Sequence, residues 1–591
     1  MVPRMSPRLL PVGACEVATN VDAFSGELRP FGGLSFQGRA TKGAAVRTIY
    51  LYDEKYWLNW LTDVHVVRGL AADDSLKRIY WTGDGAPKKA SFGVVVPDPN
   101  GDLPGGSYKM GVAAPTLAPT LVITSPGSVY VETRAYLYTY VTSWGEESAP
   151  SPASATIDVN EGDNVYVNGL PTSAPTGYPT VTSKRIYRTA VGSTGATYNF
   201  VAEVDISIAS FPDIVETTDL GVALPSLSYD EPPDDLAGLI SVANGIFAGF
   251  SGKQVLMCEP FQPHAWPTDY RYTVDYDIVG LAAIGTSIVV LTTGYPYVFT
   301  VRQPSDVTQE RVQSKQPCIS ARSIAPISSA RYNYTIYGVA YASPDGMFVI
   351  QPGTAAVETK AFMVRKDWQD LNPSTMIGTV HDDRYVGFHL DGGGPAYTGF
   401  MFDPPESLLV NLDYDVAAIC TDLQQDKLYL LIDGDIYSFD ESDLYREEYV
   451  AKTGMQVTDK PVNFGAMAVY ADYGDLLTAA EAAAYAAAIV VVNAANAALY
   501  ADLTWDEGAI GGAQIGFLPI SGDEFQDTIA APTRSLQVTL YADDVAKLTR
   551  QVTSEDPFRL PSGFLAREWA VEVQGHIATK RIELAQQAGE L

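Results

Sequence analysis

Cysteine is scarce in this sequence, with 4 residues among 591. So few cysteines in so long a chain do not form the disulfide framework of a small secreted domain. Cys258, Cys318 and Cys420 lie in or beside apolar runs typical of strands, which predicts small buried hydrophobic residues. The first fifteen residues, ending at Cys15, also lack an uninterrupted apolar signal core, because proline and arginine interrupt them. These absences favour synthesis in a reducing cytoplasm.

Basic residues are also few. The chain has 39 Lys and Arg against 70 Asp and Glu, which gives a net charge of −31 at pH 7. A protein that grips nucleic acid through phosphate groups carries a basic face, so this balance argues against ordinary DNA binding. The plain interpretation of the charge is solubility. A second interpretation is a channel surface that repels DNA, so that the polymer slides without sticking.

Motifs of the common enzyme classes are missing. The sequence holds no nucleophile elbow, no HExxH and no phosphate-cradling loop. The five histidines are scattered: His65, His264, His381, His389 and His576. Two of them flank one predicted hairpin around Asp382-Asp383, but no spaced His/Cys set completes a metal shell, so we expect exposed turn charges there. We predict a protein that is not an enzyme, with no catalytic residue, no cofactor and no metal ligand.

Two acidic or glycine-rich segments have alternative interpretations. Asp98, Asn100 and Asp102 have the spacing that begins a calcium loop, but Lys109 stands where a bidentate Glu is needed, which predicts a surface turn. The segment 391–394 (DGGG) lacks the Lys-Ser/Thr of a phosphate loop, which predicts a flexible loop.

The aromatic and acidic segment around Trp144, Glu146 and Glu147 resembles part of a sugar site. A strand-end loop is the better interpretation, because carbohydrate sites need several converging groups.

Four aspartates could include the carboxylate pair of a glycosidase. The distance between the two carboxylates decides that chemistry, and the sequence does not give this distance. They are Asp413, Asp415, Asp433 and Asp435.

Short β-prone runs between tight turns make up most of the chain. The 50 Gly, 38 Pro and 35 Tyr fit a loop-rich β protein. One unit is representative: Val339–Ala342 and Met347–Ile350 are apolar, and Ser343-Pro344-Asp345-Gly346 supplies the turn between them. Proline presets φ at the second turn position, and Gly346 takes a positive φ at no steric cost.

Similar units recur on both sides of this hairpin. Asn244-Gly245 and Asp433-Gly434 stand where two-residue reversals need them. The runs that we expect to be strands are 239–250, 254–258, 278–292, 297–301, 376–389, 397–402, 416–421 and 427–439. Many short strands, few helical periodicities and a turn every ten residues or so predict an all-β fold. We expect a β-propeller, because a radial stack of small sheets leaves only short protected edges.

Other segments flank or interrupt the predicted propeller. Residues 48–52, 57–61, 65–67 and 78–81 are expected to form one blade. The runs around residues 118–232 predict a β-sandwich of the fibronectin type III or immunoglobulin-like kind. Residues 536–543 and 567–575 alternate like half-buried antiparallel strands. The alanine-rich segment 475–502 is the one strong helical signal, and its polar residues argue against a stable bilayer crossing.

The predicted organisation therefore has five parts. They are an N-terminal extended arm (1–43), the first propeller strands (44–117), the sandwich insert (118–232), the main part of the propeller (233–452) and a C-terminal β-domain (453–591) with the helical insertion 475–502.

Three stretches resemble one protein family. They are AFSGELRPF (Ala23–Phe31), CISARSIAPI with YGVAYASPDGMFVI (within 318–350), and PFRLPSGF (Pro557–Phe564) with WAVEVQG. Each is similar to a segment of the tail nozzle or hub proteins of tailed bacteriophages, also described as tail tubular or head-to-tail stabilisation proteins. TYVTSWGEESAPSP with KRIYRT also resembles fibronectin-like inserts of phage tail proteins. The resemblance covers most of the chain.

The resemblance implies a structural virion protein that is assembled in the bacterial cytoplasm and located in the virion tail. It implies a ring of copies, usually six, that continues the DNA channel below the portal and adaptor, retains packaged DNA and gates its ejection. Double-stranded DNA would pass through the lumen without sequence-specific binding, and fibres or spikes would attach outside. The alternative is a propeller tail protein that binds glycan or degrades polysaccharide.

Overall fold

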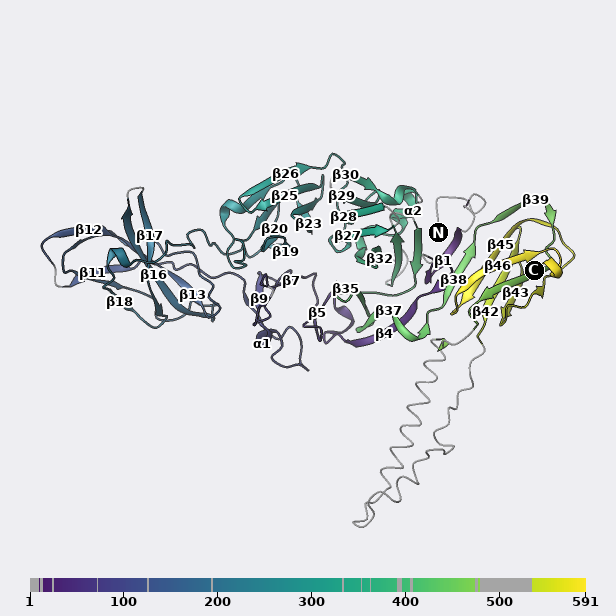
Figure 1. Ribbon diagram of the computed structural model, residues 1–591, viewed down its shortest axis with the longest axis horizontal. Coiled ribbons are helices and arrows are strands. Elements are labelled where there is room, and N and C mark those ends of the chain that lie inside the picture. Colours follow the sequence, from purple (N-terminus) through teal and green to yellow (C-terminus); the bar gives the residue numbers. More distant parts are fainter. Residues whose placement is uncertain are drawn as a thin grey trace, which may run out of the picture.

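The computed structural model describes residues 10, 14–23, 26–71, 73–124, 127–192, 195–331, 334–351, 353–361, 363–390, 396–403, 408–422, 424–473, 477–478 and 534–590. Within these residues the protein is almost entirely β-structure, and its α-helices are the short α1 (Phe92–Val95) and α2 (Arg365–Asp370) (Figure 1). Its 3-10 turns are η2 (Gly43–Ala45), η3 (Thr217–Asp219), η4 (Thr268–Tyr270), η5 (Ala321–Ser323), η6 (Glu358–Ala361), η7 (Pro373–Thr375) and η9 (Ala588–Glu590).

Three consecutive four-stranded antiparallel sheets confirm the repeated hairpin pattern. In each sheet the strands pair in the order in which they occur along the chain, as in a propeller blade. The strands are β19 (Ala237–Val242), β20 (Ile246–Ser251), β21 (Gln254–Met257) and β22 (Arg271–Thr273); β23 (Ile278–Ile284), β24 (Ser287–Thr292), β25 (Tyr297–Gln303) and β26 (Asp306–Arg311); and β27 (Ala325–Arg331), β28 (Tyr334–Ser343), β29 (Gly346–Gln351) and β30 (Thr354–Val357).

The turns of two predicted hairpins have the expected backbone conformation. Asn244 and Gly245 have φ values of 66° and 71°, and Asp433 and Gly434 have 49° and 84°. Both central residues therefore lie in the left-handed region, which a two-residue reversal matched to the strand twist requires. Gly346 has φ 152°, so the predicted positive φ at this glycine is also confirmed.

Four further sheets belong to the same architecture. Their strands are β31 (Ile377–His381), β32 (Arg384–Leu390), β33 (Tyr397–Asp403) and β34 (Leu408–Leu412); β35 (Ala418–Asp422), β36 (Lys427–Ile432), β37 (Asp435–Arg446) and β4 (Gly32–Arg39); β5 (Thr48–Tyr52) and β6 (Tyr56–Trp60); and β7 (His65–Arg68), β8 (Ile79–Thr82), β9 (Lys88–Ala90) and β10 (Tyr108–Lys109).

The prediction of one blade from residues 48–81 is wrong. These residues divide into the pair β5–β6 and the four-stranded sheet β7–β10. The reason is that β7 pairs with β8 on one side and contacts β19 of the next sheet on the other, so it is not available to β6.

The first strands of the sheets surround a common axis. Successive contacts join β7 to β19, then β19 to β23, β23 to β27, β27 to β31, β31 to β35 and β35 to β5. A shared hydrophobic cluster with Leu58, Trp60, Ile79 and Trp81 closes the ring between β5–β6 and β7–β10. The described residues therefore form a β-propeller of seven sheets, one of them two-stranded.

The N-terminal segment completes the last of these sheets. Strand β4 pairs antiparallel with β37, with Gly38 opposite Ile436 and Phe36 opposite Tyr437. The outer strand of this blade thus comes from the start of the chain and its other strands from residues 418–446, so the two ends of the propeller sequence are held together by one ladder of hydrogen bonds.

The unit inserted between β10 and β19, here called the insert, contains three sheets around one core. The sheets pair as β11-β15-β18, β12-β14 and β13-β16-β17, and buried residues such as Tyr138, Val165 and Ile186 form the core. The strands are β11 (Thr120–Thr124), β12 (Tyr130–Arg134), β13 (Tyr136–Thr142), β14 (Ile157–Asn160), β15 (Asn164–Asn168), β16 (Val181–Gly192), β17 (Gly195–Asp205) and β18 (Ser210–Asp213). The assignment to the fibronectin or immunoglobulin kind stays a prediction.

The C-terminal strands form a second flanking unit, here called the C-terminal unit. They are β38 (Tyr449–Thr453), β39 (Gln456–Val462), β40 (Ala466–Ala471), β42 (Leu536–Ala542), β43 (Val545–Val552), β44 (Phe558–Arg559), β45 (Ala566–Gly575) and β46 (Thr579–Ala585). Strands β42 and β45 pair antiparallel, as the alternation of their residues predicts.

Strand β1 (Cys15–Thr19) joins this unit to the propeller. It pairs antiparallel with β38 and makes one parallel bridge to β34, Thr19 to Asn411. One ten-stranded sheet therefore runs β31-β32-β33-β34-β1-β38-β45-β42-β43, with β39 beside β45. The remaining short strands are β2 (Val21–Asp22), β3 (Arg29–Pro30) and β41 (Leu477–Thr478).

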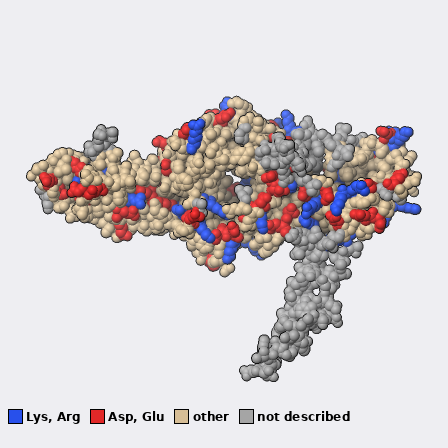
Figure 2. Space-filling view, in the orientation of Figure 1, with Lys and Arg blue, Asp and Glu red and all other residues tan. Residues whose placement is uncertain are grey.

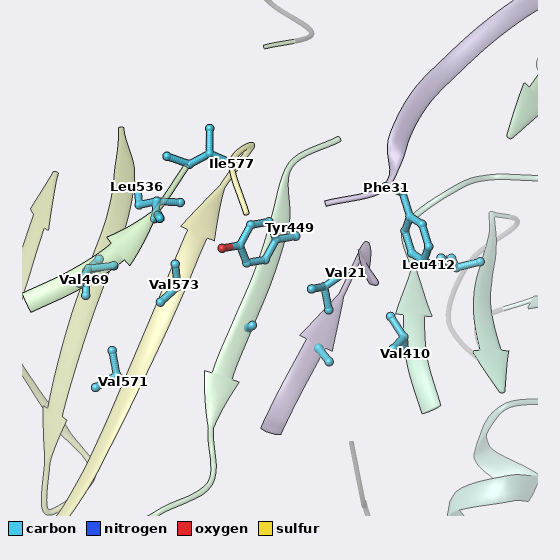
Figure 3. Packing of buried hydrophobic residues seen from close by; sticks show 14 of the residues in the cluster. Val21, Phe31, Val410, Leu412, Tyr449, Val469, Leu536, Val571, Val573 and Ile577 are labelled. Atoms are coloured by element: carbon cyan, nitrogen blue, oxygen red, sulfur yellow. The ribbon is translucent and has the colours of Figure 1, made fainter. Parts of the chain in front are cut away.

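A single hydrophobic cluster lies beneath this junction (Figure 3). Val21 and Phe31 of the N-terminal segment, Val410 and Leu412 of β34 and Tyr449 of β38 belong to it, and all are nearly or fully buried. Side chains of the C-terminal unit continue the cluster: Val469, Leu536, Val571, Val573 and Ile577.

Three predictions fall on parts of the chain that the structure leaves undescribed. The helical insertion 475–502 lies outside the described residues except for Leu477–Thr478, which form β41. The segment 391–394 lies outside them, as does most of the N-terminal arm before Ala14.

Candidate functional site

The propeller axis contains a cavity of about 220 Å³ near the start of β5 and β7. Strands β5, β7, β31 and β35 and the turn η5 contribute to its wall, so five sequence-distant segments converge there. Its polar lining residues are Arg47, Thr48, Asp63, His65, Arg322, Thr379 and Thr421.

Three charged side chains stand together in this axial cavity. Arg47 Nε and Nη2 donate to the two carboxylate oxygens of Asp63 at 3.0 and 2.9 Å, a bidentate pair. Arg322 Nε lies 3.3 Å from Asp63 Oδ1. Asp63 thus serves two guanidinium groups.

Arg322 also connects several blades of the propeller at this end of the axis. Its Nη2 donates to the backbone carbonyls of Arg47 and Ala417, at 2.8 Å each. These carbonyls precede β5 and β35, and Arg322 itself precedes β27, so one side chain connects three blades. The guanidinium fork suits such a role, because it presents several donors in a fixed geometry.

The other polar groups that line the axial cavity are hydroxyl groups and one histidine. Thr379 Oγ1 and Thr421 Oγ1 are 2.6 Å apart and share one hydrogen bond between β31 and β35. Thr48 Oγ1 donates to the Thr62 carbonyl at 2.8 Å and accepts from the Val64 amide. Burial lowers the pKa of His65, and nearby Asp63 opposes this effect. His65 is therefore neutral at pH 7.

A second cavity of about 230 Å³ adjoins the first, because Thr421 lines both. Arg68 Nε donates to the Tyr50 hydroxyl at 3.2 Å, and its Nη1 donates to Gln424 Oε1 at 3.3 Å. Asp422 lines the same cavity.

The joint between the propeller and the insert is a second concentration of buried charge. Lys89 of β9 is paired with Glu146, which follows β13, and their side chains are 1% and 5% exposed. Burial lowers the pKa of Lys89 and the adjacent Glu146 opposes the shift. Thr142 Oγ1 donates to the same carboxylate at 3.2 Å.

His264 of the propeller completes this joint. Its Nε2 lies 3.0 Å from the Glu147 carbonyl, while Nδ1 is buried without a hydrogen-bond partner among the described residues. Burial lowers the pKa of His264 to about 4. Glu147 accepts hydrogen bonds from Thr139, Arg185 and Tyr187. The segment around Trp144 is thus a strand-end loop, as predicted, and it also builds the joint, which the sequence did not indicate.

The four aspartates considered for glycosidase chemistry take part in backbone and ion-pair contacts. Asp415 Oδ1 accepts from the Tyr397 amide at 2.7 Å, and the Asp413 amide donates to Asn20. Asp435 pairs with Arg39 at 2.6 Å, and Asp433 occupies the turn before β37.

The hairpin of β31 and β32 differs in part from the expected exposed charges. Asp382 and Asp383 form its turn with φ values of 47° and 61°, and Asp382 is exposed. His389, however, is buried, at 6% exposure, and His381 is partly buried. The histidines lie on strands that pack into the propeller, so the expectation of exposed charges holds for Asp382 and is wrong for His389.

The cysteines behave mostly as predicted. Cys258 and Cys318 are buried, and burial raises the pKa of each thiol to about 12. Cys420 is partly buried. Asp98 and Asn100 form an exposed turn in which the Asp98 carboxylate accepts from the Asn100 amide at 2.9 Å.

The described part of the chain holds no group of three or more His, Cys, Asp or Glu that is placed to bind a metal ion. None of its helices has the length and apolar character needed to span a bilayer.

Charged side chains of both signs are interspersed along the lower half of the face shown in Figure 2, which includes the propeller and both flanking units.

Comparison with known proteins returned no matching family model and no matching curated protein. One similar solved structure is Hsv2 of Kluyvelomyces marxianus, with a TM-score of 0.22 and 11% identity over 49% of this chain and 71% of that chain. A second is the complex of the fission yeast SREBP-SCAP binding domains, with a TM-score of 0.24 and 13% identity over 41% of this chain and 66% of that chain. A third is the dihydro-heme d1 dehydrogenase NirN, with a TM-score of 0.22 and 10% identity over 53% of this chain and 60% of that chain. Similarity at this level carries no functional argument. The all-β propeller architecture stands on the seven sheets described above.

Proposed function

We propose that this chain is a structural virion protein, a subunit of the tail nozzle or hub of a tailed bacteriophage. One observation carries the proposal. Two of the stretches that resemble this family lie near opposite ends of the sequence, yet they supply Phe31 and Phe558 to the same buried cluster. The third stretch forms β27–β29, in the blade that precedes the ten-stranded sheet.

The continuity of that sheet supports a structural role. Strand pairing runs from β31 in the propeller to β43 in the C-terminal unit, with a ladder between β1 and β38 and a single bridge between β34 and β1. A load between the two units therefore falls on this bridge, on the β1–β38 ladder and on the buried cluster of Tyr449 and its neighbours, which resists separation of the units. A component of a pressurised conduit needs this kind of connection.

The proposal includes the assembly that the resemblance implies. Six copies form a ring below the portal and adaptor, double-stranded DNA passes through its lumen, and fibres or spikes attach outside. The net charge of −31 favours a lumen that does not bind the phosphate backbone. Gating is then a movement of loops, and the protein catalyses no reaction. The finer assignments, including the virion location, rest on the family resemblance.

Gold-labelled antibody raised against the purified chain tests the proposal on intact virions. We expect label at the tail, just below the head vertex. Antibodies against other tail proteins serve as the control for epitope access. Intact virions whose tails bind the control antibodies but not this one would contradict the proposal, and assay of polysaccharide turnover would follow.

Complementation with matched variants tests the role of the ten-stranded sheet in assembly. Virions that lack the native protein are supplied with either Tyr449→Ala or Tyr449→Phe. We expect tailless or leaking particles with the first and normal particles with the second, because only the first opens the buried cluster at β38.

A further inference from the structure

The axial cavity carries an excess of positive charge. Two guanidinium groups, those of Arg47 and Arg322, share the single carboxylate of Asp63. Among the described residues that line the cavity, Asp63 supplies the only carboxylate. With His65 neutral, the cavity has a net charge of about +1 in a chain of net charge −31.

Hydrogen-bond donors are also left over in the axial cavity. Arg47 uses Nε and Nη2 for Asp63, and its Nη1 has no hydrogen bond to the described part of the chain. The hydroxyls of Thr379 and Thr421 share one hydrogen bond, so one of their two hydrogens remains available to a ligand. The donors come from β31, β35 and the segment before β5, so the fold of the propeller itself brings them together.

Size and access limit the ligand. The volume of about 220 Å³ is below the range of about 300 to 1,000 Å³ that is typical for drug-sized ligands. The side chains of Arg47 and Asp63 are 50% and 42% exposed, so the charged end of the cavity is open to solvent. A small molecule fits these limits, and a folded segment of a partner protein does not.

We propose that the axial cavity is a binding site for a small monocarboxylate, with Arg47 and the Thr379–Thr421 pair as its donors. A single negative charge balances the excess of +1, whereas a dianion such as phosphate would overcompensate it beside Asp63. Guanidinium groups match the planar fork of a carboxylate. Occupancy would add a bridge from the segment before β5 to β31 and β35, so the ligand stabilises the propeller by mass action. The inference is independent of the assembly in which the chain works.

Titration of the full-length chain with ¹³C-labelled acetate, followed by NMR, tests this site. We expect saturable binding that Arg47→Gln weakens about tenfold, because it removes one charge-assisted donor. Asp63→Asn should change affinity in the opposite direction and tighten binding, because it removes the competing negative charge while keeping an acceptor for Arg322. Arg39→Gln is the matched control, since Arg39 makes a similar pair with Asp435 on the outer strand β4 and is not part of the cavity wall.

Several outcomes would overturn the proposal. Absence of saturation would do so, as would equal affinities for the native chain and for both cavity variants. Tighter binding of phosphate than of acetate would contradict the inference of a monoanion. Far-ultraviolet circular dichroism of each variant excludes misfolding as the cause, and the opposite sign expected for Asp63→Asn cannot arise from simple loss of structure.

Discussion

The propeller is attached to its two flanking units by different chemistry. The C-terminal unit continues a propeller sheet through β1, and its attachment is a hydrogen-bonded ladder over an apolar cluster. Among the described residues the insert shares no sheet with the propeller, and its joint is centred on the buried ion pair of Lys89 and Glu146 with His264 beside it. We therefore expect the first attachment to respond less to pH than the second, which depends on the protonation of a few buried groups.

This difference indicates which of the two attachments a small chemical change can open. An apolar ladder opens only with exposure of its whole core, whereas a buried charge pair is weakened by altering a single group. The predictions below test this contrast, beginning with the largest expected effect.

Substitution of Tyr449 by Ala should open the C-terminal attachment. The side chain is fully buried and its hydroxyl is 2.7 Å from Thr579 Oγ1, so truncation costs about 5 kcal/mol of local stability. Hydrogen exchange should become fast in β38 and β1 and stay slow in β9 and β13. Tyr449→Phe is the control and should cost about 1 kcal/mol, because it removes only the hydrogen bond. Slow exchange in β38 of the Ala variant would show that the cluster does not hold the unit.

Substitution of Lys89 by Met should open the joint with the insert. Glu146 would keep a buried charge whose remaining donor is Thr142, and breaking such a pair costs about 3 kcal/mol. Exchange should become fast at residues 142–148 and stay slow in β38. The double variant with Glu146→Met should recover most of the loss, because no unpaired charge remains. If the double variant is no more stable than Lys89→Met alone, the loss of stability does not come from the unpaired charge of Glu146.

Acidification should loosen the insert and leave the C-terminal attachment unchanged. The pKa of His264 falls from 6.5 to about 4 on folding. Between these values the unfolded state binds the proton and the folded state does not, so stability is lost as pH falls through this window, by at most about 3 kcal/mol. A proton on Nδ1 would have no acceptor among the described residues, and its charged neighbours would be Glu146, which favours the proton, and Lys89 and Arg78, which oppose it. Limited proteolysis at the insert from pH 7 to 4 measures this effect, and His264→Gln should abolish it.

The smallest effect is expected from Arg39→Gln. Arg39 pairs with Asp435 at 2.6 Å on the exposed side of the β4–β37 ladder. Exposed ion pairs contribute little, because water screens them and two side chains lose freedom. The thermal unfolding midpoint should therefore stay within experimental error of the native chain. A clear decrease would mean that exposed pairs also hold the N-terminal strand, and the contrast between buried and exposed charge would weaken.

Local signals in the sequence predict the hairpins well. Asn-Gly and Asp-Gly pairs between apolar runs define the turns at Gly245 and Gly434, and the inner strands follow from them. The outer strands β22, β26 and β30 escaped prediction because they are short or polar and none of their residues is fully buried. Strand β13 is buried at every position, and the segment 146–154 lies along its edge opposite β16 through backbone hydrogen bonds such as Ser148 to Tyr140 and Ser151 to Tyr138.

Long-range pairing and buried polar contacts could not be predicted. Strand β4 pairs with β37 across nearly the whole propeller sequence, and nothing local marks either strand as the partner of the other. Arg322, Asp63 and Lys89 look like ordinary charged residues in the sequence. Their role depends on which blades meet at the axis and at the joint, and single-sequence patterns carry no information on that.

The pairing of β4 with β37 has a consequence for biosynthesis. Arg39 leaves the ribosome 396 residues before Asp435. At about 5 to 20 residues per second, β4 therefore exists for roughly 20 to 80 seconds before its partner is translated. During that interval the N-terminal strand must remain unpaired, and the last blade cannot close on the growing chain. The propeller is therefore completed late in synthesis, and a chain released early carries an open edge that chaperones and proteases can recognise.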